Sequence, residues 1–306
     1  PIPPGADAVV MQEHASREGE TIRIDARPRP GLNVRIAGED MQAGQIVLGA
    51  GCRLGAREIA AAAAAGADAV HARRRLRVVL LVTVDEVQRA GAEPTAPGIR
   101  DINTPMLSAA IAGPAVELVC LAHGADDRDG LTRQLGDLAA GADLIVTTGG
   151  ISVGEEDHVK PALAALGAEI RFSGVAIKPG KPVSFGRLGR ATWLGLPGNP
   201  LSAFVTRQIV GTPLVLRLTG QTTPLPVRRH VVTRDTIRRK PGRCEIRPAT
   251  IAGCDAHGRE IVRFEGTTHS GRVASLPEAD GLMFLPAEAD HLPAGALVEF
   301  QPFRDT

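Results

Sequence analysis

The chain has 306 residues, too many for one small hydrophobic core, so two or three domains are expected. Its composition is that of an ordinary globular protein, with 43% hydrophobic and 23% charged residues and a formal net charge of +1. This balance, with no Tyr and only 3% aromatic residues, argues against a nucleic-acid binder, and no apolar run is long enough to predict a membrane span.

The first part of the chain is rich in turns and in short β-like stretches. Residues 8–11 and 21–24 predict strands, and glycines separate them. An alanine-rich helix is predicted over 56–66, closed by Gly66. We therefore expect a β-rich N-terminal domain over 1–44 and a helical linker region over 45–75. The chain begins without Met, in a Pro-rich stretch typical of a loop, so we expect an N-terminally truncated fragment.

From residue 76 the pattern changes to alternating strands and helices. The continuous apolar run over 77–83 is typical of a strand buried on both faces of a parallel sheet. Asn103 or Thr104 is expected to cap the next helix. The remaining predicted elements are helices at 104–112, 129–140, 157–166 and 200–218 and strands at 115–121, 143–148, 168–173, 183–186 and 192–196. This order predicts a three-layer, mostly parallel α/β domain over 76–219.

After residue 220 the helical period disappears. Short β-like stretches at 228–234, 244–251, 260–265, 281–285 and 297–301 are separated by Pro and Gly. This pattern predicts a small β-barrel-like domain over 220–306. The fold class expected for the chain is therefore α/β, with a three-layer domain flanked by β-rich parts.

Glycine-rich and basic segments follow the predicted strands of the α/β domain, where open sheets bind ligands. In the segment 149–155 a strand leads through three glycines and a Ser into a helix, an arrangement that brings backbone N–H groups close to an anion. Lys178–Pro182 holds two lysines in a loop stiffened by prolines. Leu196–Pro200 opens the long helix, with Asn199 as its expected cap. Together they predict an oxyanion site suited to phosphate, although each alone also fits a purely structural turn or helix start.

Acidic residues gather at the same predicted edge. They follow the first strand at 85–86, the second at 126–127 and the glycine loop at 155–157. Solvated acids at helix starts explain many such positions. Carboxylates beside a phosphate site are also the usual setting for Mg²⁺, which takes one or two carboxylates plus substrate phosphate.

These motifs resemble the molybdopterin molybdenumtransferases, the family that includes the C-terminal domain of gephyrin. The similarity runs over essentially the whole chain. Related molybdopterin adenylyltransferases share single motifs but lack the flanking β domains. The matching segments are Thr148–Glu155, Ile177–Pro182, Leu196–Pro200, Gly5–Val10, Gly38–Asp40 and the stretch from Ser275 to Pro286.

The resemblance implies a cytoplasmic homodimer that builds molybdenum cofactor. Its substrates would be adenylylated molybdopterin and molybdate, its products molybdenum cofactor and AMP, and Mg²⁺ would be required. A molybdopterin adenylyltransferase would be the upstream partner. Neither nucleic acid nor a membrane is expected as a partner.

The resemblance also assigns roles position by position. Asp40 would serve the site of the partner subunit, and Glu86 and Asp157 would hold the metal. The residues expected to be catalytic are Asp40, Glu86, Asp126, Asp157 and Lys178. Those expected to bind substrate are Gly149, Gly150, Ser152, Gly154, Glu155, Lys181, Pro197, Gly198, Asn199, Pro200 and Ser270, the last near the molybdate pocket.

Three features depart from the family pattern. Val84 stands where the family has Gly in a Ser/Thr-Gly-Asp/Asn-Glu run, and Val reaches positive φ only with strain. The family's Gly-Arg-x-Glu-Phe-x-Arg stretch is changed over 242–248, where the last basic residue is displaced. The family's Asp-Asn-Ser-Ala-Met-Asp-Gly segment is not in the chain. Two alternatives therefore stay open: a degenerate, non-catalytic molybdopterin-binding scaffold, and a molybdopterin adenylyltransferase.

Overall fold

The computed structural model describes residues 2–83, 87–88, 99–151, 157–222, 225–264 and 273–303. The chain divides into two compact units, Pro1–His71 and Ala72–Thr306, which are described separately. In the described part of the chain, helices are too short or too polar to cross a membrane.

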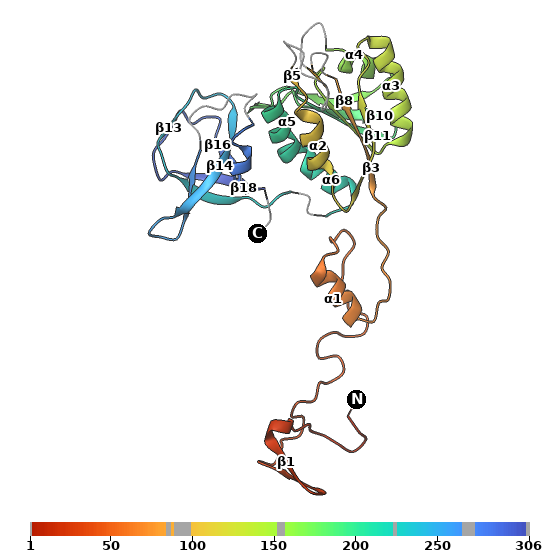
Figure 1. The fold of residues 1–306 in the computed structure, drawn as a ribbon, viewed down its shortest axis with the longest axis vertical. Coiled ribbons are helices and arrows are strands. Elements are labelled where there is room, and N and C mark those ends of the chain that lie inside the picture. The colour runs from red at the N-terminus through yellow and green to blue at the C-terminus, as the bar shows by residue number, and fades with distance from the viewer. Residues whose placement is uncertain are drawn as a thin grey trace. The chain divides into compact units, whose positions relative to one another are not determined.

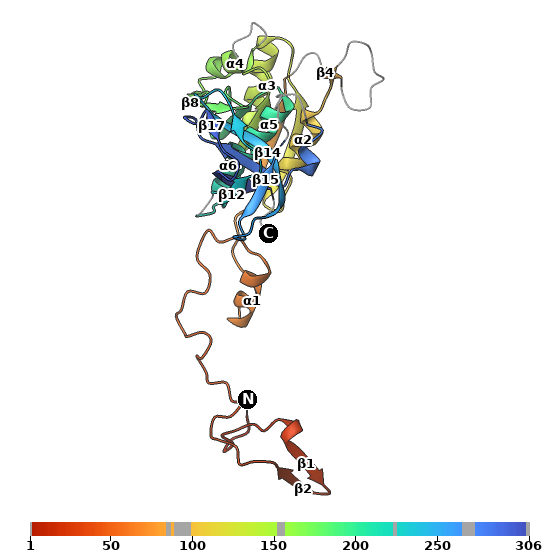
Figure 2. The ribbon, with the colours of Figure 1, turned by 90° about the vertical axis from the view of Figure 1, so that its left-hand side faces the viewer.

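The first unit is β-rich at its start and helical at its end. Strands β1 (Ala15–Glu18) and β2 (Thr21–Ile24) form an antiparallel hairpin after a 3₁₀ turn, Gln12–His14 (Figure 2). Helix α1 (Ala56–Ala64) ends as predicted, because Gly66 at φ +82° lets the chain turn back onto the last carbonyls.

The strand predicted at 8–11 is wrong. Val9 donates its backbone N–H to the carbonyl of Leu32 at 2.9 Å, and its own carbonyl accepts from the Asn33 side chain at 2.9 Å. Two hydrogen bonds with the loop at Leu32 and Asn33 therefore satisfy backbone groups that a strand would place in a ladder.

The second unit is built on a six-stranded sheet with the order β6-β3-β7-β11-β10-β8. Its first four strands in that order run parallel, and β10 is antiparallel to both its neighbours. The prediction of a mostly parallel sheet is confirmed. The strands are β3 (Leu76–Val82), β6 (Val116–His123), β7 (Leu144–Thr148), β8 (Glu169–Ser173), β10 (Ser184–Leu188) and β11 (Ala191–Leu196).

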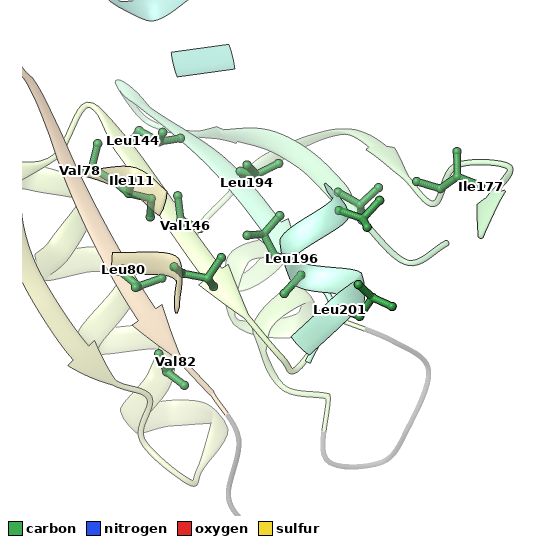
Figure 3. Close-up of a cluster of buried hydrophobic side chains, with 14 of the residues drawn as sticks. Val78, Leu80, Val82, Ile111, Leu144, Val146, Ile177, Leu194, Leu196 and Leu201 are labelled. Carbon is green, nitrogen blue, oxygen red and sulfur yellow. The ribbon is translucent and has the colours of Figure 1, made fainter. Parts of the chain in front are cut away.

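Helices cover both faces of this sheet (Figure 1). Val78 and Leu80 point into a core shared with α2 and α5 (Figure 3), whereas Val79 and Leu81 point into a second core under α3 and α4. The run at β3 is apolar throughout because both of its faces are buried. The helices are α2 (Asn103–Ile111), α3 (Arg128–Gly141), α4 (Val159–Ala165), α5 (Pro200–Thr206) and α6 (Thr212–Leu218).

Helix α2 is fastened at both ends to the chain that follows β11. The Asn103 amide donates to the Gly198 carbonyl at 2.6 Å, and the Arg207 guanidinium donates to the Ala110 carbonyl in the last turn of α2. A positive charge at the C-terminal end of α2 also interacts favourably with the helix dipole. The expected cap is therefore wrong, because the Asp101 carboxylate accepts from the Thr104 N–H and Asn103 serves as a clasp.

The long helix predicted over 200–218 is present with one irregularity. A π-helical turn, Arg207–Gly211, separates α5 from α6. Arg207 is 8% exposed within this turn, and burial lowers its pKa to about 10. The turn places the guanidinium of Arg207 against Thr212 and the end of α2.

The C-terminal strands close into a five-stranded barrel, which confirms the barrel-like prediction. Strand β15 pairs with both β12 and β14 and so completes the ring. Figure 2 shows β12, β14 and β15 gathered together. The barrel strands are β12 (Arg229–Thr233), β14 (Cys244–Cys254), β15 (Glu260–Arg263), β16 (Gly281–Leu285) and β18 (Leu297–Pro302).

Short strands also pair outside the main ladders described above. Strand β9 (Ile177–Lys178) pairs with β14, β13 (Ile237–Arg238) with β17 (His291–Leu292), and β4 (Val87–Gln88) with β5 (Ile99–Arg100). A 3₁₀ turn spans Leu276–Glu278. The domain boundaries proposed from the sequence stay a prediction.

Asp143 ties together the starts of three strands at the edge opposite the carboxyl ends. Its carboxylate accepts from both terminal nitrogens of Arg74, at 2.6 and 2.8 Å, and from the Arg77 backbone N–H at 2.9 Å. Its carbonyl accepts from Thr192. The Arg74 guanidinium holds the pKa of the Asp143 carboxyl well below its usual range, despite partial burial.

Asp143→Asn should reduce the loss of unfolding free energy that the wild type shows as pH falls. Because the carboxyl pKa is depressed in the folded state, its stabilisation is complete above the unfolded pKa of about 4 and declines as pH falls below that value. Since Arg74 is largely exposed, the loss should not exceed about 1 kcal/mol. Urea unfolding at pH 7 and pH 3 measures it, with the exposed Asp235→Asn as control. Equal acid losses in Asp143→Asn and the wild type would contradict this assignment.

Asn103→Leu should lower the free energy of unfolding by about 1–3 kcal/mol, because the buried Thr148 hydroxyl and the Gly198 carbonyl both lose their donor. Thr104→Val is the matched control on the same helix, since the Thr104 hydroxyl has no hydrogen-bond partner among the described residues. Chemical denaturation of both variants gives the comparison. A loss no greater for Asn103→Leu than for Thr104→Val would show that the clasp contributes nothing.

Candidate functional site

The carboxyl ends of four strands meet at one edge of the sheet. The Gly124 N–H donates to Val82 at 2.8 Å, Thr83 to Thr148 at 3.0 Å, and Gly149 to Leu196 at 3.1 Å. The loops that follow β6, β3, β7 and β11 are thereby joined side by side. This is the edge at which open α/β sheets bind ligands.

The glycine loop after β7 depends on residues without side chains. Gly149 and Gly150 have φ of +89° and +60°. A Cβ on Gly150 would lie 2.7 Å from Val159 in α4, and the Gly150 carbonyl accepts from the Val159 N–H at 3.2 Å. The loop is therefore pressed onto the start of α4, and its first two residues must be glycine.

The Leu196–Pro200 turn packs directly on the glycine loop. A Cβ on Gly198 would lie 3.5 Å from the Gly149 Cα. The Thr148 hydroxyl donates to the Pro197 carbonyl at 3.0 Å and accepts from Asn103 at 3.1 Å. The side chains of Thr148 and Asn103 therefore fix the two loops to each other.

Asn199 occupies the N-cap position of α5, but its side chain does not cap the helix. Pro200 occupies the first helical turn, as expected, while the Asn199 side chain makes no capping hydrogen bond. Pro197 is buried, and Gly198 and Asn199 are exposed. The predicted N-cap position of Asn199 is therefore confirmed, whereas the capping hydrogen bond expected from its side chain is not formed.

The basic loop at 178–182 is held by its apolar and glycine positions. Ile177 is buried in the core shared with α2 and α5 (Figure 3). Gly180 has φ +102° and packs so closely on Thr206 that a Cβ would collide with it. Lys178 and Lys181 are exposed. The sequence places both lysines at the surface because their neighbours are anchored.

A buried carboxylate from the barrel faces Lys178. Glu245 is 2% exposed and lies 3.5 Å from the Lys178 ammonium, 3.1 Å from Arg239 Nε and 3.0 Å from Arg247 Nε. Burial alone would raise the pKa of Glu245. The charges of Arg247 and Lys178 and the hydrogen bond from Arg239 outweigh burial and lower that pKa. Sequence reasoning missed this role of Glu245, because the cluster joins residues far apart in the chain.

Strand geometry explains the displaced basic residue. Along β14, Ile246 belongs to the core shared with the α/β domain, whereas Arg247 pairs with Met283 of the barrel core. Arg247 also stacks on Phe264, with 4.7 Å between guanidinium and ring centroid. Side chains alternate between the two faces of a strand. Because the basic residue stands at 247 and not at 248, Arg247 faces the barrel core and Pro248 faces the opposite side.

The predicted acids lie at different places. Asp126 is exposed after β6, and its neighbour Asp127 caps α3. Asp157 is half-buried shortly before α4. Burial lowers the pKa of the nearby Lys160, and the negative charge of Asp157 partly offsets that shift. Asp40 belongs to the first unit, where it is exposed and lines a groove with Arg35 and Met41.

Several predicted residues lie outside the described part of the chain, namely Val84, Glu86, Ser152, Gly154, Glu155 and Ser270. The described residues bring together Gly149, Gly150, Pro197 and Gly198 through the contacts above. Within the described ranges, no group of three or more His, Cys, Asp or Glu side chains could hold a metal.

Three family models match successive parts of the chain. The MoeA N-terminal region (domain I and II) matches residues 1–66, and a probable molybdopterin binding domain matches 80–217. The MoeA C-terminal region (domain IV) matches 230–303. The matches follow the order of the β-rich unit, the α/β sheet and the barrel.

Named relatives and a solved structure agree with these models. The molybdopterin molybdenumtransferase of Haemophilus influenzae is 32% identical over 99% of this chain and 75% of its own length. Molybdopterin molybdenumtransferase 2 of Mycobacterium tuberculosis is 30% identical over 98% of this chain and 74% of its own. The crystal structure of the molybdopterin biosynthesis MoeA protein from Pyrococcus horikoshii covers 100% of this chain and 74% of its own, with a TM-score of 0.77 and 27% identity. The chain therefore belongs to the molybdopterin molybdenumtransferase family, transferases of molybdenum cofactor biosynthesis.

Proposed function

We propose that this chain inserts molybdate into adenylylated molybdopterin, forms molybdenum cofactor and releases AMP in an Mg²⁺-dependent reaction. The observation that carries the proposal is the packing of Gly149 against Gly198 at the carboxyl ends of β7 and β11, held by Asn103. In the proposed complex this edge binds the phosphate of the AMP moiety. Glycine backbone suits this role because its N–H groups can approach an oxyanion closely.

Positive charge for the substrate would come from Lys178 and Lys181. Both are exposed, and Lys178 is held at a fixed strand position in β9. A lysine ammonium acts as a point charge toward phosphate oxygens. We propose that the Lys178 ammonium offsets the negative charge of the phosphate linkage.

The Asp157 carboxylate offers oxygen donors of the type that Mg²⁺ prefers. Asp157 precedes α4, whose first N–H binds the loop, and Glu86 is the second proposed ligand. Mg²⁺ is usually held by one or two carboxylates together with substrate phosphate and water. When bound, the ion would offset the negative charge of the phosphate linkage. Asp126 is proposed as a further functional acid at the same edge.

Asp40 is proposed to act across a homodimer, in the site of the partner subunit. It lies in the unit that precedes the sheet-bearing unit in the chain. In this proposal the dimer is cytoplasmic, and a molybdopterin adenylyltransferase supplies its substrate. Ser270 is assigned to the molybdate pocket.

One observation favours a second candidate, a molybdopterin-binding scaffold without turnover. Arg247 faces the barrel core, so Pro248 occupies the face that a basic residue would otherwise share with Ile246. A chain that binds AMP but does not release AMP from adenylylated molybdopterin would support the scaffold. The adenylyltransferase alternative instead predicts ATP-dependent labelling of molybdopterin, and the matches outside the α/β region argue against it.

The full chain, given adenylylated molybdopterin, molybdate and Mg²⁺, should release AMP. Asp157→Asn should lower kcat by about 100-fold or more, because a proposed ligand of the charge-offsetting ion is lost. AMP affinity should change little. Asp137→Asn, an exposed change in α3, is the control. Chromatographic AMP measurement decides, and a wild-type rate in Asp157→Asn would remove Asp157 from the reaction.

Lys178→Ala should weaken AMP binding by about 2 kcal/mol, the usual contribution of a charge-assisted hydrogen bond. Arg190→Ala is a matched control, since it removes an exposed cation beside the start of β11, at the opposite edge of the sheet. Titration calorimetry with AMP measures both variants. Equal affinity of Lys178→Ala and the wild type would overturn the role given to Lys178.

A further inference from the structure

The basic loop of the α/β domain is hydrogen-bonded into the barrel. Strand β9 pairs in parallel with the start of β14, so that Ile177 lies beside Cys244 and Lys178 beside Glu245. The Cys244 N–H donates to the Ala176 carbonyl at 3.1 Å. Neighbouring residues in a paired register point to the same face of a sheet. The pairing therefore sends Lys178 and Glu245 to one face and Ile177 into the apolar core on the other.

Glu245 itself is fixed by contacts within the barrel. Arg239 donates to it and also to the carbonyls of Pro286 and Ala289, at 2.6 and 2.7 Å. Arg247 donates to it while stacking on Phe264. Both side chains are at most 8% exposed. Because two buried arginines hold the carboxylate, its position does not depend on Lys178.

Lys178 differs from those two arginines in its freedom. Its side chain is 50% exposed, and a lysine has several rotatable bonds that must be ordered before it can bind an anion. One ion pair with a fixed carboxylate removes part of that freedom and leaves other ammonium hydrogens for a ligand. Among the described residues, Lys178, Arg239 and Arg247 all pair with Glu245, so their positive charge exceeds its single negative charge.

We propose that Glu245 is a positioning residue, which uses the barrel to hold the Lys178 ammonium in place for the oxyanion of the substrate. The inference rests on the proposed function. It gives the C-terminal barrel a part in anion binding by the α/β domain. Glu245 itself does not touch the substrate.

The two possible roles of Glu245 predict opposite changes in AMP affinity for Glu245→Gln. If Glu245 were only a negative charge near the site, its removal would leave more net positive charge and tighten AMP binding. If it positions Lys178, its removal should weaken AMP binding by about fivefold. In the Lys178→Ala background this loss should disappear, because the residue through which Glu245 acts is gone.

AMP titration of the full chain therefore covers the wild type, Glu245→Gln, Lys178→Ala and the double variant. Glu245→Asp keeps the charge and should retain more affinity than Glu245→Gln. Glu260→Gln is the matched control, since it removes an ion-paired carboxylate from another barrel strand and should leave AMP affinity unchanged. An equal loss from Glu245→Gln with and without Lys178, or tighter binding, would overturn the proposal.

A second readout does not need AMP. The rate at which an acylating reagent modifies Lys178, followed by peptide mass spectrometry, should rise severalfold in Glu245→Gln, because the Lys178 side chain is no longer held against the barrel carboxylate and reaches the reagent more freely. Lys181, in the same loop, is the internal control and should not change. An unchanged rate at Lys178 would overturn the positioning role. A wild-type chain that binds no AMP would contradict the proposed function, while the modification rate still decides whether Glu245 holds Lys178.

Discussion

The hydrogen bonds from the Asn103 side chain are the constraint on which the candidate site depends. One amide joins the Gly198 carbonyl to the Thr148 hydroxyl, which in turn donates to Pro197. The glycine loop and the proline turn are thereby fixed to each other and to the start of α2. A loop rich in glycine has much conformational entropy to lose, so a buried clasp of this kind preorganises backbone groups for a ligand.

A second connection extends this arrangement to the barrel. The pairing of β9 with β14 carries the Lys178 loop out of the α/β domain, and Glu245 meets it from the barrel. Gly180 fixes the other end of the loop against Thr206 in α5. The α/β edge supplies backbone groups that suit a phosphate, while the barrel limits where the positive charge can lie. This division of roles gives a physical reason for joining the two folds in one chain.

Much of the fold could be predicted because its strands carry one strong signal. The apolar run at 77–83 and those at 143–148 and 192–196 are buried on both faces, and observed strands lie within about two residues of them. Residues 8–11 carried a similar apolar signal, but none of the described strands pairs with them. The loops at 149 and 178 could be predicted from glycine, proline and lysine alone. Asn103 and Glu245 could not, because each acts on residues brought near only by the fold, and the helix-start pattern at Asn103 suggested a cap.

The central claim is that the phosphate of an AMP moiety binds at the carboxyl edge of the sheet, between the glycine loop and Lys178. A crystal structure of the chain soaked with AMP tests this most directly. The account predicts phosphate density within hydrogen-bonding distance of the backbone N–H groups near Gly149 and Gly150, with the Lys178 ammonium on the same phosphate. AMP bound elsewhere, or a phosphate contacting neither the glycine loop nor Lys178, would contradict it.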